Sequence, residues 1–157
     1  MTPFDTDRRL LVSVHILAAF GEIVRAVPAV AQTGSPLPPI VQPTEKTKAG
    51  FLARARALRD QAVREGDHAY GAVVVRDGVV VGEGRNYVVL HSDPIAHAEL
   101  LAVRDAARLN RRDLSDCDVY STATPCPMCQ GALYWVRIRR YHNEGTPEAD
   151  VAPKLAC

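Results

Sequence analysis

Four residues in two short segments could together perform metal chemistry. Cys126 and Cys129 are separated by two residues, a spacing found in metal sites and redox motifs, and His97 precedes Glu99 by two residues in the other segment. Thiolates and imidazole are zinc ligands, and three protein ligands leave a fourth position for water, as catalytic zinc sites do. Zinc lowers the pKa of bound water to about 7, and a nearby carboxylate such as Glu99 could then take the proton.

Both segments are expected at the start of a helix. Asp93-Pro94 and Thr124-Pro125 each combine a capping side chain with a proline, which loses no hydrogen bond at the first helical position. The sequence therefore predicts one helix from Asp93 to about Leu109 and another from Thr124 to Val136. We expect this position to lower the pKa of the cysteines, because unpaired N–H groups and the helix dipole favour thiolates.

Sequence patterns predict one further helix, a β-hairpin and two later strands. These are residues 51–62 with a stop at Gly66, Ala72–Arg76 paired with Val79–Val81, Cys117–Ser121, and Ile138–Tyr141. Asp77-Gly78 between the hairpin strands favours a type I′ turn. This order predicts an α/β fold whose later strands are parallel and joined by right-handed crossovers.

The chain before Gly50 is predicted to lie outside the compact domain. Residues 1–32 fit two interpretations, an amphipathic helix or an export signal, since Arg8-Arg9 precedes an apolar stretch and Ala29-Val30-Ala31 has the form of a cleavage site. An export signal would take the protein out of the cytoplasm, and the helix would leave it there. Residues 33–49 are rich in proline and predict an extended linker or a surface strap, followed by the domain at residues 50–157.

Composition narrows the possible partners. The chain has 157 residues, of which 47% are hydrophobic and 24% charged, the balance of a globular domain. A formal net charge of +1 gives no overall field that would attract nucleic acid or an anionic membrane, and no apolar run is long enough to span a bilayer. Four cysteines in a chain of this length do not indicate a disulfide scaffold, and Cys117 is expected to be a small buried hydrophobe.

The two chemical segments also match a known signature. His97-Ala98-Glu99 followed by Pro125-Cys126-Pro127-Met128-Cys129 resembles the cytidine and deoxycytidylate deaminase superfamily, whose zinc enzymes carry H-x-E and P-C-x-x-C. The segments that look most like its bacterial guanine deaminase and nucleoside deaminase branch are residues 69–75, 93–99 and 125–135. The resemblance implies a three-layer fold with a mixed central sheet flanked by helices, here with an extra N-terminal helix and a short C-terminus.

The resemblance assigns roles to the residues of the site. His97, Cys126 and Cys129 would hold one Zn²⁺ per chain, and Glu99 would move protons between the water, the ring and the leaving amine. The backbone N–H of Cys126 would stabilise the charge that develops on oxygen.

Three side chains are predicted to contact the substrate. By the resemblance Asn86 would hydrogen-bond the base, since its amide offers a donor and an acceptor. Tyr134 and Trp135 offer aromatic surface on which one ring could stack. Tyr70 is expected to serve packing, and Thr124, where the branch often has Glu, is expected to affect only local capping.

The predicted activity is hydrolytic deamination of a nucleobase or nucleoside, a guanine- or cytosine-type amidine, with release of ammonia. One alternative is a tRNA adenosine deaminase with the same zinc site, for which Arg137, Arg139 and Arg140 are the nearby basic cluster. Another is a non-catalytic zinc-stabilised binding module, which would have no use for Glu99. We expect a small-molecule substrate and no binding to membranes or nucleic acid. We also expect a homodimer, because the C-terminal elements that form the pocket wall in the family are missing.

Overall fold

In the computed structural model the described residues are 39–138, 140–144 and 149–150, so the predicted N-terminal helix or export signal lies outside them. Their helices and strands are α2 (Lys48–Arg64), β1 (Gly71–Arg76), β2 (Val79–Arg85), α3 (Ala98–Ala106), the 3₁₀ turn η1 (Ala107–Leu109), β3 (Cys117–Ser121), α4 (Pro127–Trp135), β4 (Arg140–His142) and β5 (Ala149–Asp150). None of the described helices is both long and apolar enough to cross a membrane.

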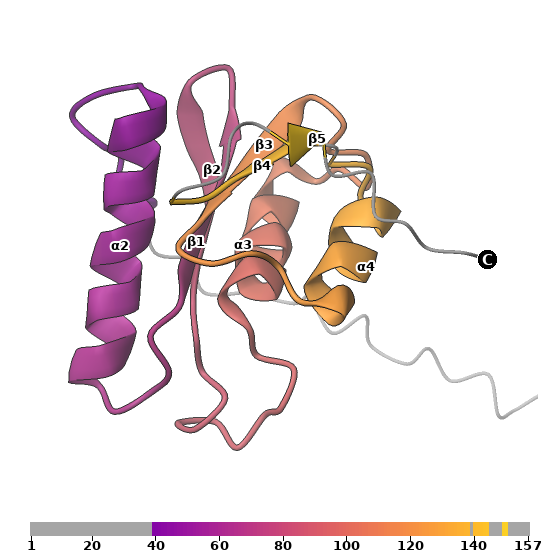
Figure 1. Ribbon diagram of the computed structural model, residues 1–157. Coiled ribbons are helices and arrows are strands. Elements are labelled where there is room, and N and C mark those ends of the chain that lie inside the picture. Colours follow the sequence, from indigo (N-terminus) through magenta and orange to yellow (C-terminus); the bar gives the residue numbers. More distant parts are fainter. Residues whose placement is uncertain (1–38, 139, 145–148, 151–157) are drawn as a thin grey trace, which may run out of the picture. The chain divides into compact units, whose positions relative to one another are not determined.

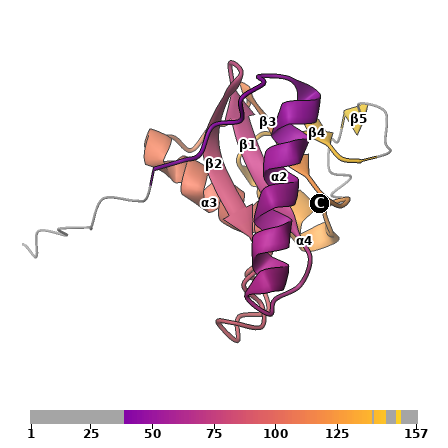
Figure 2. The same cartoon turned by 90° about the vertical axis from the view of Figure 1, so that its left-hand side faces the viewer.

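The strands of the described residues form one mixed sheet in the order β2-β1-β3-β4-β5. Strand β1 is antiparallel to β2 and β3, whereas β3 and β4 are parallel and β4 and β5 antiparallel. Helix α2 covers one face of the sheet, and α3 and α4 lie on the other (Figures 1 and 2). The predicted three-layer α/β fold is confirmed, including the parallel pair of strands that α4 connects.

Alternate residues of β1 divide the core between the two faces of the sheet. Ala72 and Val74 pack with residues of α3 and α4, and Val73 and Val75 pack with α2. The apolar residues that α2 contributes, at the helical spacing predicted from the sequence, are Phe51, Leu52 and Leu58. A strand buried on both faces explains the unbroken apolar run in β1.

The hairpin turn has the predicted geometry. Asp77 and Gly78 have φ angles of 51° and 72°, and a type I′ turn requires positive φ at both central residues. The turn joins β1 to β2 in antiparallel register, with Arg76 opposite Val79. The longer observed strand β2 continues to Arg85, which brings the chain directly to Asn86.

The described part of the proline-rich segment contacts the domain. Ile40 packs against the α2 side of the core, and the Gln42 side chain donates to the Val80 carbonyl (2.7 Å) and accepts from the Val80 N–H (2.9 Å). Helix α2 begins at Lys48, two residues before the expected domain start, because the Thr47 hydroxyl caps it by accepting from the Gly50 N–H. Residues 39–46 therefore form a surface strap along β2.

The predicted start of α3 at Asp93 is wrong, because Asp93 closes a turn instead. Its carboxylate accepts from the Ile95 N–H at 3.0 Å, and its carbonyl accepts from the Ala96 N–H at 3.1 Å. The helix begins at Ala98, with His97 in extended conformation as its N-cap residue.

The start of α4 was also predicted too early. The first helical residue is Pro127, with Cys126 as the N-cap residue, and the Pro125 carbonyl accepts from the Gln130 side chain (2.8 Å). Two prolines in this segment could each start a helix, and Pro127 is the one that does. Both corrections place a predicted metal ligand at the cap itself.

Helix α3 approaches β2 too closely for any side chain between them. A Cβ atom on Gly84 would lie 2.1 Å from the Ala98 carbonyl oxygen and 2.5 Å from the Ala102 backbone nitrogen. A Cβ on Gly82 would lie 2.3 Å from the Ala102 carbonyl oxygen. Because these neighbours are backbone atoms, the two glycines set the distance between α3 and the sheet.

We expect Gly84→Ala to lower the free energy of unfolding by about 1–3 kcal/mol or more, because α3 must move away from β2. Gly131→Ala is the control: a Cβ there meets no atom within 4 Å, and alanine favours a helix by about 0.5–1 kcal/mol. Urea unfolding followed by circular dichroism measures both. Equal stability of the two variants would contradict the close approach of α3 and β2.

Candidate active site

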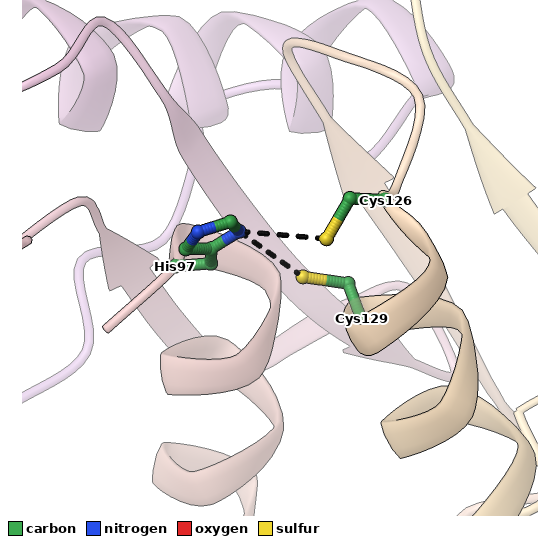
Figure 3. A group of neighbouring side chains, drawn as sticks. All are labelled: His97, Cys126 and Cys129. Carbon is green, nitrogen blue, oxygen red and sulfur yellow. Dashed lines mark hydrogen bonds between the residues drawn. The ribbon is translucent and has the colours of Figure 1, made fainter. Parts of the chain in front are cut away.

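The three predicted metal ligands lie together at the N-terminal ends of α3 and α4 (Figure 3). His97 Nδ1 is 3.6 Å from Cys126 Sγ and 3.7 Å from Cys129 Sγ. Among the described residues these three form a group with one ligand atom each, all within 4.8 Å of one another. Two helices far apart in the sequence thus bring one imidazole and two thiols to one point.

This spacing fits zinc. Nitrogen at about 2.0–2.1 Å and sulfur at about 2.3 Å from a tetrahedral zinc ion lie about 3.5–3.6 Å from each other. The observed distances from His97 to the two cysteines, 3.6 and 3.7 Å, agree with that geometry. Three protein ligands would leave one coordination position for water or substrate, which is the arrangement of a catalytic site.

Glu99 lies beside the ligands in the first turn of α3 and is 5% exposed. Its Oε1 accepts from the Ser121 hydroxyl at 2.7 Å, and its Oε2 accepts from the Cys129 thiol at 3.6 Å. Ser121, at the end of β3, is itself fully buried. The sheet therefore orients the Glu99 carboxylate. Glu99 is not one of the three residues that form the candidate metal site.

The pKa of Cys129 moves in the opposite direction from the one predicted. Burial, followed by the nearby charge of Glu99 and contacts with Cys126, raises the pKa of the Cys129 thiol, so these effects outweigh the helix dipole. Burial likewise raises the pKa of Cys117 to about 12, in agreement with its prediction as a buried hydrophobe. A stable thiolate at Cys129 therefore requires a cation beside it.

A cavity of about 180 Å³ opens onto this group. The residues that line it are Tyr70, Asn86, His97, Glu99, Ala123, Thr124 and Cys126. Sites for drug-sized ligands usually measure about 300–1,000 Å³, so this cavity suits one small ring system.

The predicted substrate contacts divide into two groups. Asn86, which is 1% exposed, lies in the cavity wall, where a contact with a base is possible. Tyr134 and Trp135, at the end of α4, are 46% and 78% exposed and do not line the cavity. The roles of all three toward substrate stay predictions.

Sequence patterns gave no signal for several residues of the cavity wall. Tyr70, expected to serve packing, lines the cavity and is 45% exposed. Thr124, expected to affect only capping, lines it too, and its hydroxyl accepts from the Asn143 amide at 2.8 Å. Ser121, which does not line the cavity but donates to Glu99, was expected only as part of a strand. The contacts of these residues depend on the assembled sheet, which local spacing does not reveal.

Comparison with known proteins identifies relatives of this site. The guanine deaminase of Bacillus subtilis is 46% identical over 104 residues, which are 64% of this chain and 67% of that enzyme. Its solved structure has a TM-score of 0.56 at 44% identity, over 58% of this chain and 59% of that one. A tRNA-specific adenosine deaminase of Aquifex aeolicus is 38% identical over 91 residues, which are 57% of this chain and 60% of that enzyme.

A further solved structure, of a protein in complex with 2,6-diaminopurine, has a TM-score of 0.58 at 28% identity and covers 62% of this chain and 56% of that one. The chain thus spans between 56% and 67% of the length of these relatives. Residues 45–143 match the family described as the cytidine and deoxycytidylate deaminase zinc-binding region. The match includes all four residues of the predicted signature. The chain belongs to this deaminase family, as its resemblance to the guanine deaminase and nucleoside deaminase branch predicted.

Proposed function

We propose that the protein is a zinc-dependent hydrolytic deaminase of a small nucleobase or nucleoside. The observation that carries this proposal is the placement of Glu99 within one small cavity with His97 and Cys126, while Ser121 orients its carboxylate. Hydrolysis of a ring amidine needs a metal site that activates water and a carboxylate that moves protons without binding the metal.

His97, Cys126 and Cys129 hold the metal in this proposal. When bound, zinc supplies the Lewis acidity that activates water for attack on the amino-bearing ring carbon. Glu99 accepts a proton from the attacking water and delivers it to the ring nitrogen. It then takes the proton of the hydroxyl group added to the ring carbon and delivers it to the amine, so that the C–N bond breaks, ammonia leaves and a carbonyl remains. The Cys126 backbone N–H, at the N-cap of α4, stabilises the oxygen that becomes the product carbonyl.

A small substrate is favoured over a folded RNA. One structural relative was solved with a free purine, 2,6-diaminopurine, and the cavity has room for one small ring system. A single base flipped out of an RNA would need a cavity of similar size, so the arginines near the end of α4 matter more. Of the predicted basic cluster, Arg137 pairs with Asp113 at 2.9 Å and Arg140 with Asp118 at 2.6 Å, while Arg139 lies outside the described residues. Both described arginines of this cluster are therefore already engaged by carboxylates of the same chain.

Two other functions and the assembly state remain hypotheses to be tested. The tRNA adenosine deaminase alternative is supported by relatives with that name, such as the Aquifex aeolicus protein. The non-catalytic zinc module is disfavoured, because burying a carboxylate costs stability that a structural zinc site does not require. The homodimer stays a prediction.

The metal prediction concerns stoichiometry. We expect about one zinc ion per purified chain and its loss in Cys126→Ala, because the two ligands that remain bind zinc weakly. Cys117→Ala is the matched control and should keep zinc, since Cys117 lies in the core at the start of β3. Elemental analysis by mass spectrometry gives the ratio. Zinc lost equally from both variants would disprove the assignment of ligands.

The catalytic prediction concerns Glu99. We expect Glu99→Gln to retain zinc and fold but to lose turnover by about 10²–10⁴-fold, because an amide cannot shuttle protons. Ammonia release, zinc content and melting temperature are measured on the same preparation. Undiminished turnover would mean that another group moves the protons.

The substrate prediction compares free bases with RNA. We expect ammonia release from at least one of guanine, cytosine, adenine or their nucleosides, and little conversion of a tRNA anticodon stem-loop at equal enzyme concentration. The reasons are that one structural relative was solved with a free purine and that Arg137 and Arg140 are each paired with a carboxylate. Salt-sensitive conversion of the stem-loop alone would favour the tRNA-editing alternative, because phosphate contacts weaken as salt rises.

A further inference from the structure

A buried carboxylate lies directly behind the cavity wall, in the connection between α2 and β1. Asp67 is 8% exposed, and each of its two oxygens accepts two hydrogen bonds. Oδ1 accepts from the Asn86 side-chain Nδ2 at 2.9 Å and from the His68 N–H at 2.7 Å. Oδ2 accepts from the N–H groups of Val89 (3.0 Å) and Leu90 (2.9 Å).

This set of donors keeps Asp67 ionised. Burial alone would raise the pKa of its carboxyl group, but hydrogen bonds from the Leu90 and His68 backbones and from Asn86 outweigh burial and lower the pKa. An ionised carboxylate only accepts hydrogen bonds, so it can bind only the nitrogen end of a neighbouring primary amide.

That restriction acts on Asn86, whose amide could otherwise point either way. With Nδ2 committed to Asp67, the amide retains Oδ1 and one N–H for a ligand in the cavity. The order of acceptor and donor that the wall presents is then fixed before any substrate binds. A base whose edge has the reverse order would leave buried polar groups unpaired, which costs binding energy.

Asp67 also fixes the chain on which Asn86 lies. Val89 and Leu90 belong to the loop between β2 and α3, which begins at Asn86 and ends at His97. The Asn86 N–H donates to the carbonyl of Tyr70, another residue of the cavity wall (3.1 Å). The Asp67 carboxylate therefore connects the segment that carries Tyr70 to the loop that carries Asn86, and both of these residues line the cavity.

From these contacts we infer that Asp67 is a positioning residue for substrate recognition: it sets the orientation of the Asn86 amide and thereby which ring edge the cavity accepts. Asp67 does not line the cavity and acts through Asn86. The kinetic consequence rests on the proposed deaminase function, whereas the orientation of the amide does not.

The first test measures the amide itself in the intact protein. In ¹⁵N-labelled protein, with the Asn86 signal assigned by its loss in Asn86→Ala, we expect one Nδ2 proton to exchange with solvent about tenfold or more slowly than the protons of exposed Asn110. Exchange of both Asn86 protons as fast as those of Asn110 would overturn the inference.

The second test is a double-mutant cycle on kcat/KM for the best substrate. We expect Asp67→Asn to lower kcat/KM about tenfold, because asparagine can also donate and no longer fixes Asn86. In an Asn86→Ala background the same change should have less than about twofold effect, because the amide that it positions is gone. Zinc content should stay unchanged in all variants.

Asp105→Asn is the matched control for loss of a structural carboxylate. Asp105 accepts from the Glu83 N–H at 2.9 Å and pairs with Arg108 but touches no cavity residue in the described part of the chain. It should lower the melting temperature and leave kcat/KM within about twofold.

Equal fold-losses from Asp67→Asn in both backgrounds would overturn the inference. If the unmodified protein deaminates nothing, the proposed function fails, and the exchange measurement alone decides the orientation of Asn86.

Discussion

The close contact between α3 and β2 is the constraint on which the site depends. Gly84 allows the backbone of Ala98 to approach the strand, and Ala98 is flanked by His97 and Glu99. Metal–ligand distances tolerate shifts of only about 0.2 Å, so a displacement of α3 by one methyl group would separate His97 from the cysteines of α4. The glycines of β2 therefore help to set the position of His97, a predicted metal ligand, although they are not ligands themselves.

Burial is the second constraint on the site. It raises the pKa of the Cys129 thiol, and the neighbouring carboxylate of Glu99 raises it further. The charged thiolate form of Cys129 is therefore costly without a cation beside it. Zinc binding at this site would therefore be accompanied by release of the Cys129 proton.

The sequence allowed the chemical residues and the fold class to be predicted because both depend on local spacing. His97 and Glu99, the two cysteines and the Asp77-Gly78 turn are all defined by neighbours along the chain. The start of α3 could not be predicted, because Asp93-Pro94 has the sequence of a helix start. In the folded chain Asp93 closes a turn, and the helix begins only at Ala98. Ser121 and Asp67 were missed because their partners lie about twenty residues away, across the sheet and its loops.

Chemistry and selectivity are held by different parts of this fold. The N-terminal ends of α3 and α4 carry the predicted metal ligands and Glu99, and Ser121 of the sheet orients the Glu99 carboxylate. The opposite side of the cavity comes from Tyr70 and Asn86, whose segments are joined through Asp67 and hydrogen bonds to the loop after β2. A change in these connecting segments can alter which ring is accepted while the metal group stays intact. The zinc signature therefore predicts the reaction, whereas we infer that the choice of substrate depends on the hydrogen bonds of Asp67 behind the cavity wall.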